Sequence, residues 1–254
     1  MHTVSLLEQE FFATTASKID ANLSAVNELI TYCQKNTEDI TDALDRAERL
    51  MELLFVDKLF TELPCLHASI KCHQLDHVLT YRTFSPALKN LLLIHIIRSC
   101  GFDVAAVYVP NHVMLRIVCD DDYAIIFNSL DGNPLNWLEL DQRINDLDSS
   151  NEQATLEAID DNQLIVQYLI SLKNALIREQ EFTLALQCVD IILALNPNDP
   201  YHRRDRGFLL QQLDCYKVAF DDYRYFVEKC PQDPQAKILQ MQLDMISQVT
   251  IKLH

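Results

Sequence analysis

The sequence has very little glycine and no long hydrophobic run. Only three of its 254 residues are glycine. Because glycine supplies most left-handed turns and bulges, a chain with so few is expected to be mostly helical. The apolar run Leu91–Ile94 is broken by His95 and is far too short to span a bilayer. The composition therefore predicts a protein without a transmembrane segment.

Positive charge is also scarce. The chain has 21 lysines and arginines against 37 acids, a formal net charge of -16. Such a surface repels phosphate backbones, and no basic stripe offsets it, which disfavours binding to nucleic acid or to an anionic membrane. The N-terminus carries acids where a signal peptide needs a basic start, so we expect a cytoplasmic protein.

Closely paired cysteines are missing as well. Eight cysteines are spread along the chain without any CxxC, which indicates reduced thiols that behave as small hydrophobes. One cluster mixes thiols and imidazoles, and its members are Cys65, His67, Cys72, His73 and His77. Zinc could use four of them, but their spacing fits no zinc motif, and solvated histidines beside buried thiols are the simpler interpretation. We expect neither a metal nor a cofactor.

Helical patterns fill the first hundred residues. Residues 36–55 place apolar side chains at three- and four-residue spacing, and Asn36 is expected to cap that helix. A weaker helix is predicted for residues 17–30. Residues 85–101 begin with Ser-Pro and end at glycine, as helix caps do, and are apolar nearly all round. They are expected to form the buried central helix of an N-terminal domain.

The hydrophobic period then changes to two. The segments DVAAVYVP, HVMLRIVC and YAIIFNSLDG predict a small three-stranded antiparallel sheet packed on the central helix, closed by turn residues in LDGNP. From about Asp146 to Asp161 the chain turns polar and acidic, which favours a domain boundary there. We predict an α+β fold, with a mainly helical domain at residues 1–150 and an all-α domain at residues 160–254.

The C-terminal part contains an internal repeat. LNPNDP at residues 195–200 recurs 34 positions later as KCPQDP, and Phe182 recurs at this period as Tyr216. Ala185 likewise recurs as Ala219. This period is typical of tetratricopeptide repeats, in which small residues let two antiparallel helices cross closely. Two repeats followed by a capping helix are predicted.

This order of elements, together with the run NPNDPYHRRDRGFLLQQLDCYKVAFDDYRYFVEKCPQDP, resembles the SirB family of bacterial proteins. The resemblance implies a transglutaminase-like domain followed by a tetratricopeptide tail. Enzymes of that fold use a cysteine at the start of the central helix, a histidine on the next strands and an orienting Asp or Asn. His112 matches the histidine of this set, and Asn128 matches the orienting residue. The nucleophile position is matched by Ala87, whose methyl group cannot attack, and Ser85 is better used as a helix cap.

Neighbouring thiols do not replace the missing nucleophile. Cys100 lies about 20 Å from the helix start, and the helix C-terminus there is expected to raise its pKa. Cys119 lies at the far end of the strand that begins at His112. The sequence therefore predicts a degenerate, non-enzymatic domain. The alternative is a thiol- or serine-dependent acyl transferase or peptidase that uses His112 and Asn128, with Ser85 or another thiol as nucleophile.

A basic cluster at residues 202–206 stands out on this acidic chain. A tetratricopeptide pair presents a concave surface that holds a peptide or helix of another protein, and Arg203, Arg204 and Arg206 could pair there with its carboxylates. They could equally pair with acids of the chain itself; the candidates are Asp214, Asp221 and Asp222. We predict an interaction or regulatory protein whose partner is a protein or peptide.

Overall fold

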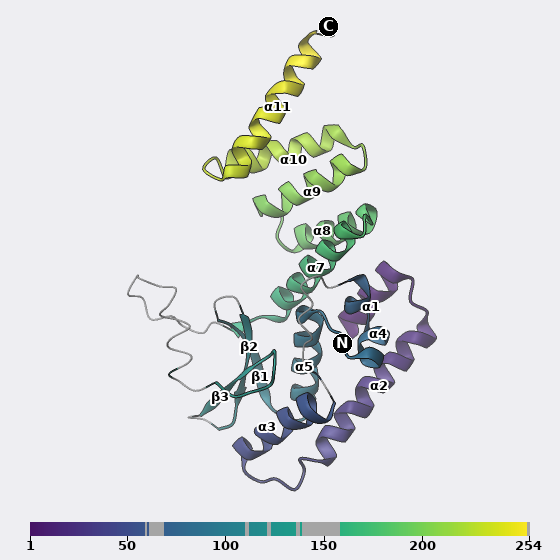
Figure 1. The fold of residues 1–254 in the computed structure, drawn as a ribbon, viewed down its shortest axis with the longest axis vertical. Helices are drawn as coiled ribbons and strands as arrows, with labels where there is room; N and C mark the ends of the chain where they lie inside the picture. Colours follow the sequence, from purple (N-terminus) through teal and green to yellow (C-terminus); the bar gives the residue numbers. More distant parts are fainter. Residues whose placement is uncertain are drawn as a thin grey trace. The chain divides into compact units, whose positions relative to one another are not determined.

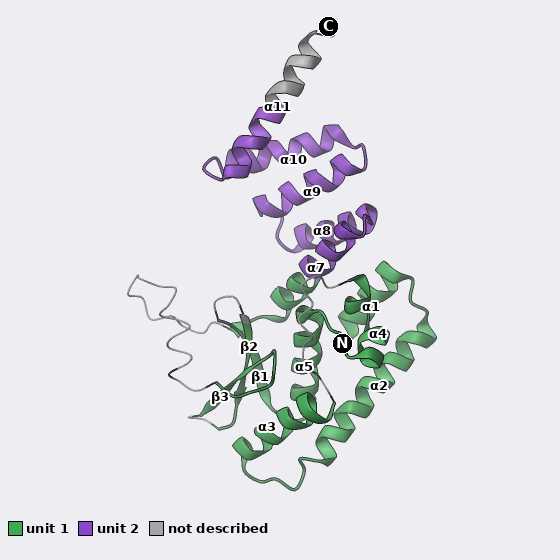
Figure 2. Ribbon diagram, in the orientation of Figure 1, with its two compact units in different colours: residues 1–168 green, residues 169–254 purple. Residues whose placement is uncertain are grey.

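The computed structural model of the chain describes residues 1–58, 60, 69–109, 112–120, 123–135, 138 and 158–252, without the side chains of residues 109, 112 and 244–252. The chain divides into two compact units, residues 1–168 and residues 169–254 (Figure 2). Helix α7 (Asp161–Arg178) contributes its first residues to the first unit and the remainder to the second.

The first unit is mainly helical, and its helices lie on one side of a small sheet (Figure 1). Its described helices are α1 (His2–Phe12), α2 (Ala16–Lys35), α3 (Ala43–Glu52) with its π-helical continuation η1 (Leu53–Asp57), the short η2 (Ile70–His73), α4 (Leu75–Tyr81) and α5 (Pro86–Ser99). The mainly helical α+β class predicted from the sequence is confirmed.

Helix α3 begins later than the sequence predicts. Asn36 does not cap it, because α2 continues to Lys35 and the Asn36 side-chain amide donates to the carbonyl of Tyr32 at 2.8 Å. The residue that caps α3 is Asp42, whose carboxylate accepts the N–H of Asp45 at 2.9 Å. Asn and Asp are equally good caps, so the sequence pattern did not distinguish these two positions.

Helix α5 is the buried helix that the sequence predicts. The hydroxyl oxygen of Ser85 accepts the N–H of Leu88 at 3.3 Å, and Gly101 follows the helix in the left-handed conformation (φ 86°). Eight of its residues are buried: Leu88, Lys89, Asn90, Leu92, Leu93, Ile94, Ile96 and Ile97. A helix buried on so many sides needs caps at both ends, because its terminal backbone groups have few waters to bind.

The sheet has the strand order β3-β2-β1-β4 and is antiparallel throughout. The three predicted strands are β1 (Asp103–Val109), β2 (His112–Val118) and β3 (Ala124–Asn128), and a two-residue strand β4 (Ala158–Ile159) is added at the free edge of β1. Helix α5 packs against β1. Side chains alternate between the faces: Leu115 and Phe127 pair on one face, while Met114 and Ile126 join a cluster with Val107 on the other.

The turn after β3 is tied to the helices by Gly132. Its N–H donates to the carbonyl of Asn128 at 2.9 Å, and its φ of 76° is one that residues with a side chain rarely adopt. A Cβ at this position would collide with the ring of Phe55. Glycine is therefore required here twice, by the backbone angle and by the close approach of η1.

The second unit is all-helical. After α7 come α8 (Phe182–Leu195), α9 (Pro200–Gln212), α10 (Tyr216–Lys229) and α11 (Pro234–Lys252). The repeated alanines Ala185 and Ala219 are fully buried, and a Cβ on Gly207 would lie 2.8 Å from the ring of Tyr223. Small residues thus let the paired helices approach closely, as the 34-residue period predicts. Helix α11 packs against α10 as the expected capping helix.

In the part of the chain described by the structure, no helix is both long enough and apolar enough to cross a bilayer.

Candidate functional site

The nucleophile position of the predicted catalytic site holds no reactive atom. Ala87 lies in the first turn of α5 and is partly exposed. Ser85, the nearest hydroxyl in the sequence, is fully buried, and its oxygen serves as the cap of Leu88. Its backbone N–H is also engaged, donating to the carbonyl of Cys72 at 2.8 Å. Ser85 is therefore held as a structural residue at the start of the helix.

His112 and Asn128 occupy nearby positions on adjacent strands. His112 begins β2 two residues before Met114, and Met114 pairs with Asn128 at the end of β3. The Asn128 side-chain oxygen accepts the N–H of Leu130 at 3.0 Å in the turn that follows. The side chain of His112 lies outside the described residues, so a contact between the two predicted partners stays a prediction.

Two thiols of the first unit have neighbours that the sequence does not reveal. The hydrogen bond from Ser85 brings Cys72 beside the start of α5, where it is buried, with its Sγ 3.6 Å from the hydroxyl oxygen of Ser69. Cys100 caps the other end of α5, as expected. Its pKa is lowered, and not raised as the helix dipole alone predicts, because the Cys33 thiol donates a hydrogen bond to it and Arg46 is near.

The predicted thiol and imidazole cluster is only partly described. Cys65 and His67 lie outside the described residues. His73 is fully buried, and its Nδ1 lies 3.0 Å from the carbonyl oxygen of Ser69. Within the described ranges, no three or more His, Cys, Asp or Glu side chains are grouped so as to hold a metal ion.

Two of the three predicted arginines, Arg203 and Arg206, share one buried acid of the chain itself. Arg206 on α9 donates from Nε and Nη2 to the two carboxylate oxygens of Asp222 on α10, each at 2.7 Å. Arg203 lies 3.6 Å from the same carboxylate and donates to the carbonyl of Pro197. Asp222 is 2% exposed. This arrangement balances a buried charge and holds the second repeat together.

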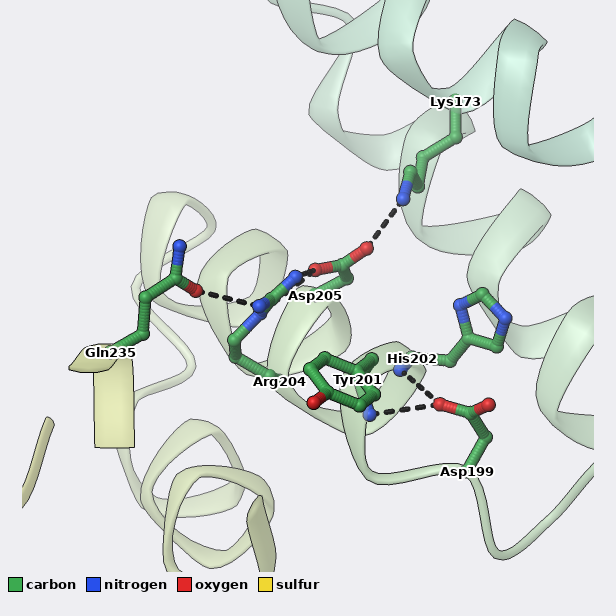
Figure 3. Close-up of polar contacts among 7 residues, drawn as sticks. All are labelled: Lys173, Asp199, Tyr201, His202, Arg204, Asp205 and Gln235. Carbon is green, nitrogen blue, oxygen red and sulfur yellow. Dashed lines mark hydrogen bonds and ion pairs between the residues drawn. The ribbon is translucent and has the colours of Figure 1, made fainter. Parts of the chain in front are cut away.

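The third arginine, Arg204, belongs to a row of polar side chains that runs across three helices (Figure 3). Lys173 on α7 donates to one oxygen of Asp205 on α9 at 2.5 Å, and Arg204 donates to its other oxygen at 2.8 Å. Arg204 also donates from Nη1 to the amide oxygen of Gln235 on α11 at 2.6 Å. Burial alone would raise the pKa of Asp205, but Lys173 and Arg204 hold it below its usual value.

This row lies along a groove of about 570 Å³ in the second unit. The groove is lined by polar residues from these three helices and by Tyr223 of α10. Its apolar side chains are Ile177, Phe208, Ile238 and Leu239. Phe208 is 39% and Ile238 54% exposed, a high exposure for such large hydrophobic side chains. The groove therefore combines charge with accessible apolar surface, as ligand-binding sites do.

Most of the groove residues were not predicted from the sequence. Of the predicted arginines, only Arg204 lines it. Lys173 could have been singled out from the sequence, because it interrupts the buried apolar stripe of Leu169, Leu172 and Ala175 on its helix. A lysine inside such a stripe needs a buried partner, but the sequence does not say that the partner is Asp205 on another helix.

Comparison with protein families fits this architecture. A family model described as the transglutaminase-like superfamily matches residues 18–169, and one described as the tetratricopeptide repeat matches residues 172–244. The class of the protein is thus a transglutaminase-like domain joined to a tetratricopeptide repeat domain. No solved structure matches the chain.

Curated relatives identify the family more closely. The chain is 35% identical to a UPF0162 protein of Vibrio cholerae over 70% of this chain and 68% of the relative. It is 30% identical to the UPF0162 protein YchA of Escherichia coli and 29% identical to the protein SirB1 of Salmonella typhimurium, in each case over 89% of this chain and 85% of the relative. The chain belongs to this family of SirB1 and UPF0162 proteins within the transglutaminase-like superfamily, as its sequence motifs predict.

Proposed function

We propose that the protein is not an enzyme and that it acts by binding another protein through the groove of its tetratricopeptide unit. The observation that carries the proposal is the groove itself, with its exposed Phe208 and Ile238 beside charged side chains. Tetratricopeptide repeats generally bind other proteins on such surfaces. We further propose that the transglutaminase-like domain spans about residues 1–150 and the repeats about residues 160–254.

The loss of catalysis is supported by the residues at the start of α5. Ala87 has no nucleophilic atom, and the Ser85 oxygen is already bonded to the amide of Leu88. Asn128 uses its side-chain oxygen within its own turn. The acyl-transfer alternative therefore requires a nucleophile from elsewhere, and Cys72 is the described thiol that is bonded through its backbone to the helix start.

Catalysis is tested with the purified full chain and two variants, His112→Ala and Cys72→Ala. Peptide hydrolysis and acyl transfer to a primary amine are measured on generic thiol-ester and amide substrates. We expect the same background rate from all three proteins. Turnover by the wild type that disappears in either variant would show that the domain is an enzyme.

Partner binding is tested with a matched pair of substitutions. Ile238→Asp places a charge in the groove, whereas Val218→Asp places one on an equally exposed position of α10 outside it (54% and 50% exposed). The full chain and both variants are used as bait, and bound proteins are quantified by mass spectrometry. Partners that Ile238→Asp loses and Val218→Asp retains support the groove; partners retained by both variants contradict it.

Of the three arginines predicted to bind the partner, we propose that one makes direct contact. Arg204 lines the groove and is proposed to contact the partner directly. Arg203 and Arg206 are proposed to act indirectly, by holding Asp222 and hence the repeat. Arg204→Met is therefore the preferred probe of partner contact, because Asp205 keeps its bond to Lys173 in that variant, whereas changing Arg206 removes both hydrogen bonds to the buried Asp222.

A further inference from the structure

The polar side chains of the groove offer mostly hydrogen-bond donors. Lys173 and Arg204 are donors only, and the Tyr223 hydroxyl already donates to Gln211. Asn174 and Gln235 each carry an amide with two N–H donors and one acceptor oxygen, and the oxygen of Gln235 is already bonded to Arg204. The one acid in the lining, Asp205, already binds a cation at each of its two oxygens. A ligand that satisfies this lining must therefore bring acceptors.

The net charge of the groove also favours a ligand that carries acceptors. Two cations and one anion line it, which leaves an excess of one positive charge. The rest of the second unit is nearly neutral and so does not offset this positive charge: residues 169–254 contain 10 basic and 11 acidic residues. The negative charge of the chain lies mainly in residues 1–168, which contain 11 basic and 26 acidic residues. A ligand with a single negative charge therefore complements the groove.

The Arg204 guanidinium has a bond that a carboxylate can replace. Its Nη1 donates to the neutral amide oxygen of Gln235, an exposed residue of α11. A carboxylate can accept two parallel bonds from a guanidinium and adds the attraction of opposite charges, which the neutral amide lacks, so a carboxylate displaces the amide, which returns to water. The adjacent Phe208 and Ile238 then contact whatever lies beside that carboxylate.

We propose that the groove holds a segment of another protein in which one carboxylate, from Asp, Glu or a chain terminus, adjoins large apolar side chains. The carboxylate binds Arg204 in place of Gln235, and the apolar side chains pack on Phe208, Ile238 and Leu239. This inference rests on the proposed function and names the chemistry of the partner.

The probe is a peptide selected by the protein itself. A random library of displayed 12-residue peptides is selected on the immobilised full chain, and the recovered peptides are synthesised with a fluorescent label. Each peptide is made in two forms, one with its carboxylates and one with amides in their place. We expect Asp, Glu or a free terminus next to Leu, Ile, Phe or Met, and affinity about 10-fold or more lower for the amide form, since hydrogen bonds to charged groups contribute about 1.5–3 kcal/mol.

A double-mutant cycle locates the carboxylate. In Arg204→Met the two peptide forms should bind equally, because the group that distinguishes them is gone. Arg224→Met removes an arginine outside the groove and should leave the full difference in place. Phe208→Ser should weaken both forms alike. The amide form should bind Arg204→Met with about its wild-type affinity, which shows that the variant is folded and that the lost difference comes from the missing guanidinium.

The outcomes separate this inference from the proposed function. If Phe208→Ser weakens binding but acid and amide forms bind wild type within twofold, the carboxylate is refuted and the groove function stands. If the acid-to-amide loss persists in Arg204→Met, the carboxylate binds elsewhere and the inference fails. If selection yields no peptide, or the selected ones ignore Phe208→Ser and Ile238→Asp, the groove function itself fails.

Discussion

Arg206 and Asp222 join the two helices of the second repeat through two parallel hydrogen bonds of 2.7 Å. The carboxylate is almost fully buried, while the arginine side chain is 27% exposed. A guanidinium fork matches both oxygens of a carboxylate at once, so this pair also fixes the rotation of α9 against α10. Arg203 adds a second positive charge on the same acid.

Replacing Asp222 with asparagine should destabilise the repeat. The change removes the buried negative charge to which two partly exposed arginines are bonded, and losing hydrogen bonds to a charged group costs about 1.5–3 kcal/mol. We expect faster hydrogen exchange of the amides of α9 and α10 and a lower midpoint of urea unfolding in the full chain. Asp221→Asn is the control, because Asp221 pairs with Arg224 on the surface, where both are 62% exposed, and it should change stability by less than about 0.5 kcal/mol. Equal effects of the two variants would refute this account.

Two glycines with similar backbone angles should respond differently to alanine. Gly101 (φ 86°) has open space where a Cβ would lie, so Gly101→Ala should cost only the backbone strain of about 1–2 kcal/mol. Gly132→Ala adds the collision with Phe55 and should cost more, about 2–4 kcal/mol. Urea unfolding of the full chain measures both. A smaller loss at Gly132 would show that η1 moves aside without cost.

Glu8 should make the stability of the first unit depend on pH. Its side chain is 2% exposed and accepts the N–H of Leu75 at the start of α4, and burial raises its pKa from 4.5 to about 7. The folded protein therefore keeps the proton where the unfolded chain has lost it. This favours folding fully below about pH 4.5, and the contribution is lost as the pH rises to about 7.

The rise in the pKa of Glu8 corresponds to a contribution on the order of 3 kcal/mol to the free energy of unfolding. Glu8→Gln should remove it, so the difference in unfolding free energy between wild type and variant should change between pH 4.5 and pH 7 and stay constant above. Urea unfolding at several pH values measures this difference. Glu10→Gln changes an exposed position of the same helix, so the free energy of unfolding of this variant should depend on pH as that of the wild type does. A constant Glu8→Gln difference across this range would contradict the raised pKa.

Cys100 should react faster with iodoacetamide than Cys33, Cys119 and Cys188, whose pKa values are raised. Its pKa is lowered by the hydrogen bond from Cys33, whereas burial raises the pKa of Cys119 and, to about 12, that of Cys188. Cys33→Ala removes the donor and should slow Cys100 several-fold, because the thiolate is the nucleophile. Peptide mapping of the alkylated protein at pH 8 follows each site. An unchanged Cys100 rate in Cys33→Ala would show that this bond does not control it.

This reactivity also changes how a labelling experiment is interpreted. A fast thiol in this protein does not by itself indicate an acyl-transfer enzyme, because Cys100 lies at the end of α5 opposite to the position of a catalytic nucleophile. Among the described thiols, rapid labelling at Cys72, beside the start of that helix, would favour the enzyme.

The features that the sequence predicted well are those encoded by local periodicity. The central helix has caps at both ends, and the repeat recurs at a fixed spacing with small residues at the helix crossings, so neither required knowledge of distant contacts. The start of α3 was predicted six residues too early, because Asn36 and Asp42 offer the same capping chemistry. Strand β4 has only two residues and carries no period at all.

The groove escaped prediction for a different reason. Its polar row is formed by residues 173, 205 and 235, which belong to three helices and meet only when these pack. The sequence showed an unusual basic cluster but not which of its arginines faces α11 and which face α10. Charge pairing across helices depends on their rotation, and single-residue patterns do not contain that information.

Gln235 gives Arg204 a resident neutral acceptor, and in the proposed binding mode this limits how long a partner stays bound. An arriving carboxylate must displace that bond, so the net gain is only the difference between a charged and a neutral acceptor. If that difference gives a dissociation constant of about 10 μM, an ordinary association rate of about 10⁶ M⁻¹s⁻¹ implies release within about a tenth of a second. A groove that binds in the proposed way releases its partner quickly enough for brief, repeated sampling of many molecules of that partner.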